Sequence, residues 1–472
     1  MSRLETPSSV TAFNILPIEL NKAIAHYLDD DRDIAAFSST CHTTRSAIYA
    51  DRLSFWRTKF REKYDFVDGP SNILLLRMYQ RRSKQFRRGI QYDFFRGHGP
   101  REARVARMLK DLIIESFQGA TEVNEHGHLI CKNQVQLIKF VLESRLLNND
   151  RRAPLPTQGE PANVEATLAA VKLMCSQFIF NLTGLKHNIF AFDESQYAVY
   201  QSSVVAPIFT SDHKVLNLEW ILHSMNFFRH HMMNEETQTL FDKVDELEAT
   251  HKPSAWREPL RQGAQPLSKH WKGTYSFLEH REVNRLRRQG PGKDMYCDKN
   301  IDEGKIQSLK LNFAQDGRLA DGTKLKWPTV YEQRLGSLRN DPGKQCIRTQ
   351  GRNTPKAIES IQFKGRGEDL EDDYKALGWL NPLPPQGGIP GWQRITFMKH
   401  FSEDYEDPDH DNLWAYEGAV LPGGRIILGR WWFASNTHQP YEEYNGPFIL
   451  WAVDEPELDE DDEDDEEDAD SE

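Results

Sequence analysis

The sequence has no long apolar run and few cysteines. No stretch approaches the roughly 20 consecutive apolar residues that a transmembrane helix requires, and the first ten residues hold no apolar segment typical of a secretory signal. The five cysteines are scattered, odd in number and without a CxxC pair, which argues against a disulfide framework or a structural zinc site. We therefore expect a cytoplasmic and/or nuclear protein with reduced thiols and no membrane partner.

The motifs of common enzyme classes are also missing. There is no nucleophile elbow, no HExxH pair and no GxGxxG in a βαβ setting. Residues Gly290–Lys293 read Gly-Pro-Gly-Lys, without the spacing or the Ser/Thr of a phosphate-binding loop. His223, His230 and His231 could lie close together on one helix, but neither Cys nor carboxylate accompanies them. We predict no catalytic residue, no metal site and no cofactor.

Positive charge is absent from the end of the sequence. Asp454–Glu472 contains 15 acidic residues and no Lys or Arg. The chain as a whole has 59 basic and 71 acidic residues, so setting those 15 aside leaves an excess of 3 positive charges. A block of like charge repels itself and cannot bury apolar surface. We therefore predict a disordered acidic tail at residues 454–472.

The segment from Phe13 to about Phe66 has the apolar periodicity of three short helices. In the first helix apolar residues recur at every fourth position, and Pro17 is tolerated in the first turn. Asp33 is a suitable N-cap for the second helix. The apolar positions of the three predicted helices are Leu16, Leu20, Ile24 and Leu28; Ile34, Phe37, Cys41 and Ile48; and Tyr49, Leu53, Trp56 and Phe60.

An ordered set of residues in this segment resembles the F-box domain. The set is Leu16-Pro17-x-Glu19-Leu20, Ile24, Tyr27-Leu28, Asp33-Ile34, Phe37, Thr40-Cys41, Arg45 and Phe55-Trp56-Arg57. It departs from the family at His42, where Lys or Arg is common. The resemblance implies binding to a Skp-type adaptor of an SCF cullin–RING ubiquitin ligase. The implied adaptor-binding residues are Leu16, Pro17, Leu20, Ile24, Leu28, Phe37, Cys41 and Trp56.

About fifty residues cannot bury a complete core, so leftover apolar surface on these helices needs a partner. The alternative is that the stripe packs on the chain's own middle region. That region, residues 67–265, is predicted to be a basic connector followed by helices. The connector places aromatic residues among arginines between Arg77 and Arg107, a pattern shared by nucleic-acid-binding segments. Because Arg stems also cover apolar surface, we expect no nucleic-acid partner.

Beyond about Pro266, short strand-like segments alternate with Gly-rich turns. Leu421-Pro422-Gly423-Gly424 between two of them predicts a hairpin. Several strands of this kind indicate an antiparallel barrel or sandwich.

This C-terminal region also resembles the lipocalin-like barrel found behind some F-boxes, including many fungal ones. The carrying residues are Trp271-x-Gly273-Thr274-Tyr275, Arg281-Glu282-Val283, Tyr416-x-Gly418-x-Val420, Gly429-Arg430-Trp431-Trp432 and Gly446-Pro447-Phe448-x-x-Trp451. In that family the barrel recognises substrate, and Arg among aromatic residues is typical of protein interfaces. The implied substrate-binding residues are Trp271, Tyr275, Arg430, Trp431 and Trp432. The alternative is that the tryptophans only form core and wall.

These observations together predict an α+β multidomain protein. Its parts are an F-box at residues 11–66, a helical region at 67–265, a β-barrel-like domain at 266–453 and the acidic tail. The expected function is that of a non-catalytic adaptor that links an unknown target protein to a ubiquitin ligase. Two alternatives stay open: a small-ligand enzyme or binding protein that uses the barrel, and an F-box regulator without ligase output.

Overall fold

The computed structural model divides into two compact units. The first, the helical unit, comprises residues 1–92 and 107–144, and the second, the barrel unit, comprises residues 93–106 and 145–472. The structure describes residues 12–125, 127–147, 154, 156, 161–182, 189–201, 208–209, 214–237, 239–292, 301, 303–314, 318–320, 322, 324–329, 331, 360–402, 412–434 and 444–454. The predicted acidic tail lies outside these residues except for Asp454. No helix among them is long and apolar enough to cross a bilayer.

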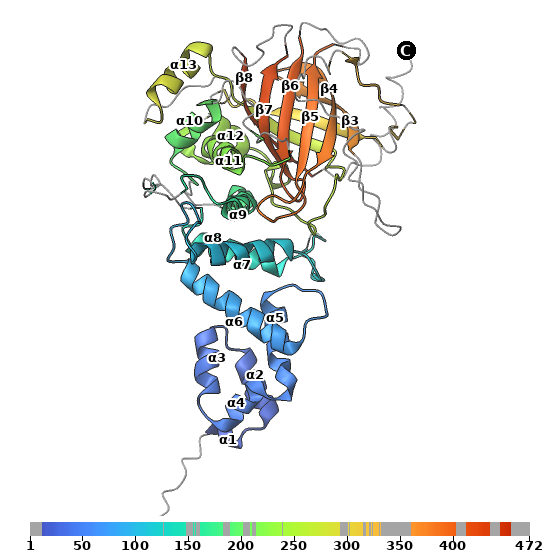
Figure 1. The fold of residues 1–472 in the computed structure, drawn as a ribbon. Coiled ribbons are helices and arrows are strands. Elements are labelled where there is room, and N and C mark those ends of the chain that lie inside the picture. The colour runs from blue at the N-terminus through green and yellow to red at the C-terminus, as the bar shows by residue number, and fades with distance from the viewer. Residues whose placement is uncertain are drawn as a thin grey trace, which may run out of the picture. The chain divides into compact units, whose positions relative to one another are not determined.

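The helical unit begins with short helices that follow one another closely (Figure 1). Its elements are α1 (Ala12–Ile15), α2 (Ile18–His26), α3 (Asp31–Ser38), α4 (His42–Tyr49), η1 (Asp51–Leu53), α5 (Ser54–Lys63), α6 (Asn72–Gly89), α8 (Lys132–Glu143) and, from Arg107 onward, α7 (Glu102–Ile114). Helices α6 and α8 therefore share a compact unit with the predicted F-box segment. The helices α9–α12 belong with the barrel, so the predicted middle region 67–265 is not a unit of its own.

The prediction of three helices in the first segment was wrong, because the second is two helices. Helix α3 ends at Ser38, and α4 starts after Cys41, whose extended backbone (φ −158°) makes it the N-cap. The Cys41 N–H donates to the Thr44 hydroxyl at 3.2 Å, which stabilises this start. The predicted N-cap of the second helix was also wrong: Asp30, not Asp33, accepts the capping bond from the Arg32 N–H at 2.8 Å.

Aromatic residues form the centre of the helical unit. Trp56 packs against Phe55 and Tyr79 with ring centroids 5.3 and 5.4 Å apart, and all three rings are buried. The buried ammonium of Lys59 donates to the carbonyl of His26 at 3.0 Å and pairs with Glu62 at 2.8 Å, so α2 and α5 are joined by a satisfied charge.

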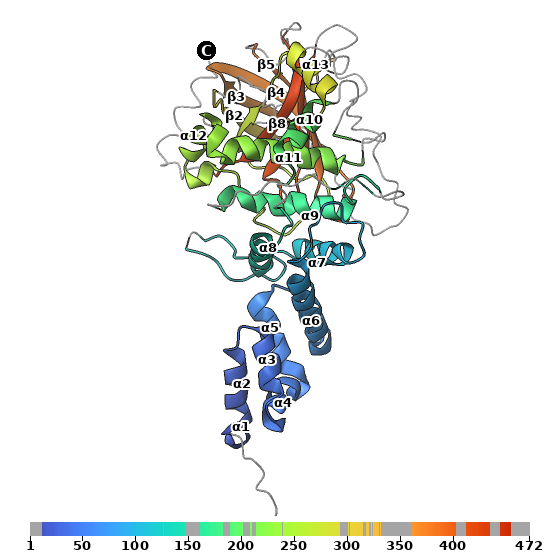
Figure 2. The same cartoon turned by 90° about the vertical axis from the view of Figure 1, so that its left-hand side faces the viewer.

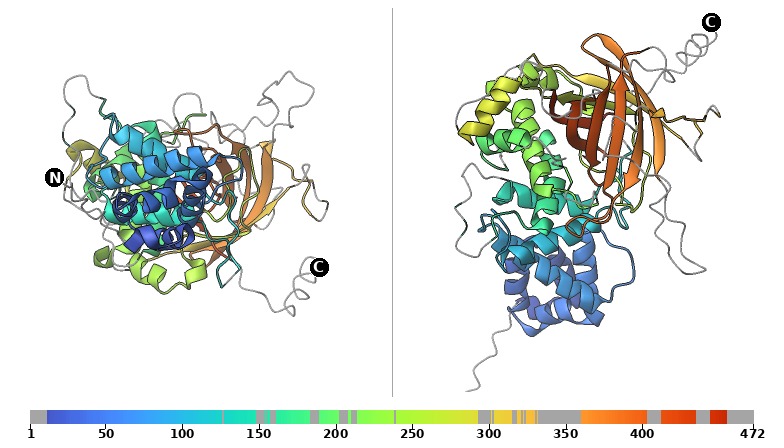
Figure 3. Two further views of the ribbon diagram at one scale, coloured as in Figure 1. Left: turned by 90° about the horizontal axis from the view of Figure 1, so that it is seen from below. Right: turned by 45° about the horizontal axis from the view of Figure 1, so that its top comes forward.

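Helices precede and interrupt the strands of the barrel unit. They are α9 (Ala166–Ser176), η2 (Gln177–Asn181), α10 (Phe192–Gln201), α11 (Leu218–Met233), η3 (Glu235–Thr237), α12 (Thr239–Asp245), η4 (Ala249–His251) and α13 (His280–Gln289). Helix α9 is buried from Leu168 to Ser176. Helix α11 packs on β7 and β8, and α10 packs on β8, so this layer covers one side of the barrel (Figures 2 and 3).

Eight antiparallel strands close into a barrel in which each strand pairs with the next along the chain. They are β1 (His270–Tyr275), β2 (Gln307–Phe313), β3 (Ile361–Asp369), β4 (Asp372–Pro382), β5 (Gln393–His400), β6 (Trp414–Val420), β7 (Ile426–Phe433) and β8 (Asn445–Ala452). Pairing of β1 with β8, from Trp271 opposite Ala452 to Tyr275 opposite Phe448, completes the ring. The predicted antiparallel barrel is confirmed.

The predicted hairpin between β6 and β7 is confirmed as well. The Leu421 N–H donates to the Ile426 carbonyl at 2.9 Å, and the Gly424 N–H donates to the Leu421 carbonyl at 3.0 Å. Gly423 and Gly424 have φ values of +93° and +67°, which residues with a Cβ rarely adopt. Gly423 also lies so close to Trp256 that a Cβ would fall 2.1 Å from the Trp256 Cβ.

Side chains alternate between the interior and the outside of the barrel. The interior cluster consists of Trp271, Leu309, Leu311, Phe363, Tyr374, Ala376, Leu380, Ile395, Phe397, Tyr416, Val420, Ile427, Trp431, Phe448, Leu450 and Ala452. A second cluster lies on the outer face of β4–β7 and consists of Tyr331, Leu377, Met398, Leu413, Ala415, Trp432 and Ala434. This alternation decides which predicted residues can meet at one site.

Candidate functional site

Helix α2 turns large apolar side chains outward and smaller or polar side chains inward. Leu20 is 51% exposed and Tyr27 is 87% exposed, whereas Asn21 and Ala25 are fully buried. Ile15 in α1 is 73% exposed. Side chains of this size normally gain free energy when they leave water. We call Ile15, Leu20 and Tyr27, with the half-buried Leu16 and Ile24 between them, the α1–α2 stripe.

The eight residues implied in adaptor binding fall into three groups. Pro17 and Leu20 are exposed. Leu16, Ile24, Leu28 and Cys41 are half-buried.

The third group, Phe37 and Trp56, is buried in the core of the helical unit, where Phe37 packs edge-on against Phe13 with ring centroids 5.3 Å apart. These two residues therefore support the fold and are not available to a partner at the surface. The prediction did not include Ile15 and Tyr27 among the binding residues, although Tyr27 lies seven residues after Leu20 and hence on the same helical face.

A cavity of about 530 Å³ opens at one mouth of the barrel. We call it the mouth cavity. Its walls are largely aromatic, and Trp431 lies 5.5 Å from both Tyr275 and Trp414 between ring centroids. The other lining residues are Phe277, Asp369, Leu370, Asp372, Asp373, Lys399, Phe401, Asn412, Tyr416 and Tyr444. The cavity is thus a set of ring faces with carboxylates around them.

A buried ion pair between Lys399 and Asp369 forms part of the wall of the mouth cavity. The Lys399 ammonium also lies 4.0 Å from the ring centroid of Tyr374 and 5.2 Å from that of Phe401. Burial lowers the pKa of Lys399 against the opposing effect of Asp369, while burial raises the pKa of Tyr374 well above its ordinary value.

The charges of Lys399 and Asp369 cancel each other. The exposed carboxylates of Asp372 and Asp373 therefore make the rim of the mouth cavity negative. Aromatic walls with a negative rim bind cations well, since a cation is attracted by ring faces and by carboxylates together. The geometry therefore favours a basic or aromatic group as the occupant.

Of the implied substrate-binding residues, Tyr275 and Trp431 line the mouth cavity. Trp271 is in the interior cluster and donates its indole N–H to the Ser268 carbonyl at 2.7 Å. Arg430 and Trp432 lie on the opposite face of β7 from Trp431, so grouping all three at one pocket was wrong. Arg430 stacks over the ring of Trp432 at 4.9 Å on the outside of the barrel.

The sequence reasoning missed four important members of the cavity, namely Asp369, Lys399, Trp414 and Tyr444. Lys399 could have been found from the alternation in β5, because it follows Ile395 and Phe397 on the interior face. Trp414 likewise alternates with Tyr416 in β6. Asp369 at the end of β3 and Tyr444 just before β8 carry no comparable signal.

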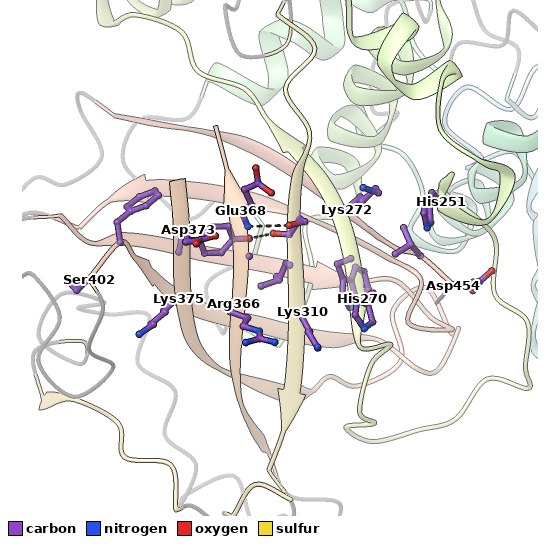
Figure 4. Close-up of a pocket in the computed structure, with 17 residues that line it drawn as sticks. His251, His270, Lys272, Lys310, Arg366, Glu368, Asp373, Lys375, Ser402 and Asp454 are labelled. Atoms are coloured by element: carbon purple, nitrogen blue, oxygen red, sulfur yellow. Dashed lines mark hydrogen bonds between the residues drawn. The ribbon is translucent and has the colours of Figure 1, made fainter. Parts of the chain in front are cut away.

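A larger groove of about 830 Å³ lies on the outer face of β1–β4 (Figure 4). Six basic side chains line it, among them His251 and Lys272. The other four come one from each strand and stand opposite one another in register: His270 with Lys310, Lys310 with Arg366, and Arg366 with Lys375. We call these four the basic row. Figure 4 shows Lys310, Arg366 and Lys375 side by side and pointing the same way.

No protein-family model, curated protein or solved structure matches this chain.

The three histidines of α11 are held by aromatic neighbours. His223 stacks on Phe190 at 4.0 Å, and His230 stacks on Phe192 at 3.8 Å. Burial lowers the pKa of His223 to about 3, of His230 to about 4 and of His231 to about 3, so all three are neutral at pH 7. Among the residues that the structure describes, no group of three or more potential ligands could hold a metal ion.

Ser195, His223 and Asn226 form a hydrogen-bonded cluster between α10 and α11. Ser195 Oγ and His223 Nδ1 are 3.1 Å apart, and Asn226 donates to Ser195 Oγ at 2.9 Å. Ser195 and Asn226 are fully buried. A nucleophile has to reach its substrate, so this arrangement fits a structural link between the two helices.

Proposed function

We propose that this protein is the substrate-recognition adaptor of an SCF-type cullin–RING ubiquitin ligase. The observation that carries the proposal is the α1–α2 stripe, because exposed apolar side chains occupy positions at which the sequence resembles an F-box. A helix that buries Asn21 and exposes Leu20 and Tyr27 is arranged for a partner outside its own unit. In this function the chain performs no bond chemistry and raises the concentration of a target near the ligase.

The mouth cavity supplies the target-binding part of the proposal. Its aromatic walls and acidic rim fit a Lys, Arg or aromatic side chain of a target protein. Binding would place that side chain between Tyr275, Trp414 and Trp431.

The adaptor part is tested by co-purification with a Skp-type adaptor, comparing the intact chain with Leu20→Asp. Burying one Leu side chain contributes roughly 1.5–3 kcal/mol, so its replacement by a charge weakens binding by at least about 10- to 100-fold. The matched control is Leu142→Asp in α8, because Leu142 is 44% exposed in the same unit. Equal adaptor recovery with both variants, or no adaptor with the intact chain, contradicts the proposal.

The target part is tested by proximity labelling with the intact chain and with Trp414→Ala. We expect a subset of labelled proteins to disappear in the variant, because it removes one wall of the mouth cavity. Trp379→Ala is the control, since Trp379 lies on β4 and does not line the cavity. If the same labelled proteins disappear with both variants, the cause is general destabilisation of the barrel and not loss of the cavity wall.

A second candidate function is binding or conversion of a small ligand in the barrel. The size of the mouth cavity favours it, because about 530 Å³ lies within the range of small-molecule sites. Binding of a small-molecule panel to the full chain, measured for the intact protein and for Leu20→Asp, separates the two functions. A ligand that binds both equally, with no adaptor recovered from the intact chain, would favour this second function.

A further inference from the structure

The basic row places the cationic side chains of Lys310, Arg366 and Lys375 directly opposite one another on adjoining strands, with His270 next in register on β1. Residues paired in this way have Cβ atoms about 4.5–5.5 Å apart, and like charges there are destabilising. The row runs across β1–β4, from His270 through Lys310 and Arg366 to Lys375. A polyanion is complementary in charge to such a row.

The acidic end of the sequence begins inside this groove. Asp454 and Val453 both line it, and the Val453 N–H donates to the carbonyl of His270, the first member of the row, at 3.0 Å. Asp454 is itself held by Arg257 at 2.6 Å and by Arg425 at 3.0 Å. The root of residues 455–472 is therefore fixed beside the basic row.

We propose that the basic row binds the chain's own acidic segment, residues 455–472. This segment holds 14 Asp or Glu residues among 18 and has no basic residue. Adjacent strands lie about 4.8 Å apart, so the row is about 14 Å long. Eighteen extended residues reach up to about 60 Å, which is far more than the path from Asp454 to Lys375 requires.

Glu368 and Asp373 also line the groove. They stand opposite each other in the register of β3 and β4, near the turn that joins the two strands. Figure 4 shows Glu368 pointing away from the direction taken by Lys310, Arg366 and Lys375. The two carboxylates therefore bound the groove at one end, and the side chains of the row are directed away from them. The inference is independent of the proposed function, because it uses no residue of the α1–α2 stripe or the ligase.

Zero-length carbodiimide cross-linking of the full chain, followed by mass spectrometry, tests this directly. The reagent joins a Lys amine to a carboxylate, so we expect links from residues 455–472 to Lys310 and Lys375. The links should vanish in 1 M salt, where the Debye length is about 3 Å. Arg366→Glu should reduce them several-fold, whereas Lys364→Glu, the same charge change on the same face of β3 outside the groove, should leave them unchanged.

Three results would overturn the proposal. The first is linking of residues 455–472 to lysines outside the groove at equal yield. The second is linking between two molecules, detected with a mixture of isotopically labelled and unlabelled chains. The third is linking of Lys310 and Lys375 to the acidic residues 403–411 instead.

A second measurement asks whether the segment shields the row from other polyanions. In a full-length variant, the 14 acidic residues of 455–472 are replaced by Asn and Gln. We expect binding of a random single-stranded DNA at low salt to rise on the order of tenfold in this variant, because phosphates can then reach the row. Adding Arg366→Glu should reverse the rise. Equal DNA binding by the intact and neutralised chains would contradict occupation of the row.

Discussion

Replacing Asp369 by Asn tests the buried ion pair of the mouth cavity. Both side chains of the pair are nearly inaccessible, with 3% and 7% of the Lys399 and Asp369 side chains exposed. The variant keeps the size of the side chain but removes the negative charge that compensates Lys399. Lys399 Nζ also lies 3.5 Å from Gln307 Oε1, which is a neutral acceptor and cannot replace a carboxylate.

The expected loss in the free energy of unfolding can be worked out from the proton that Lys399 carries. Without Asp369 the folded chain can avoid a buried, uncompensated charge by releasing the proton of Lys399. Releasing it costs about 1.36 kcal/mol of folding free energy for each unit by which the pH lies below about 10.4, the pKa of Lys in the unfolded chain. At pH 7 that is at most about 4.6 kcal/mol, in line with the roughly 3–5 kcal/mol that breaking a buried pair costs. We therefore expect Asp369→Asn to lower the free energy of unfolding by about 3–5 kcal/mol at pH 7.

The pH dependence has a definite sign. Burial already lowers the pKa of Lys399, and loss of Asp369 lowers it further. Between the folded pKa and about 10.4 the unfolded chain binds the proton and the folded chain does not, so stability rises with pH. The penalty of the variant should therefore shrink as the pH is raised from 7 toward 10.

Urea unfolding of the full chain, followed by tryptophan fluorescence, measures both effects. The double variant Asp369→Leu/Lys399→Met is the control, because replacing a buried pair by apolar side chains is often neutral or stabilising. A loss below about 1 kcal/mol in Asp369→Asn at pH 7, or a penalty that does not change up to pH 10, would refute the reasoning.

Two further predictions concern other parts of the barrel unit. Gly423→Ala should destabilise the unit by roughly 1–3 kcal/mol, since its Cβ would meet Trp256 at 2.1 Å; Gly290→Ala, at φ +72° with no atom within 4 Å, is the control and should cost less in urea unfolding. His231 has a folded pKa of about 3, so below pH 6.5 only the unfolded chain gains its proton and stability falls. The loss between pH 6.5 and pH 5 is about 1.6 kcal/mol for this residue, because the unfolded imidazole is already half protonated at pH 6.5. A fall of stability that is unchanged in His231→Gln, measured by urea unfolding at both pH values, would contradict this assignment.

The barrel could be predicted from the sequence because its signals are local. Alternating apolar residues mark β2, β3 and β5, and the Pro-Gly-Gly turn after Leu421 demands positive φ. Helix α13 between β1 and β2 was missed, because only Val283 and Leu286 of its ten residues are buried and the rest are mostly charged. Val283 and Leu286 lie three residues apart, as on one face of a helix, but two apolar positions are too few to establish a helical period.

Errors in the candidate sites have a different physical origin. The break between α3 and α4 depends on Cys41 as N-cap, and Cys is not among the residues that usually mark such a start. The grouping of Arg430 with Trp431 ignored the two-residue period of a strand, which the sequence itself contains. Lys399 and Asp369 form a buried pair across strands, and no single-sequence pattern identifies such a partner.

Pairing of Trp271 in β1 with Ala452 in β8 has a consequence for how the chain folds. The ring cannot close until the last strand is present, so β1 and β7 each keep an unpaired edge throughout synthesis of the barrel. Contacts between such distant parts of a sequence form slowly, and open strand edges recruit other chains. A chain that stops before β8 would therefore be expected to aggregate, which makes the final strand the element on which the whole barrel depends for its solubility.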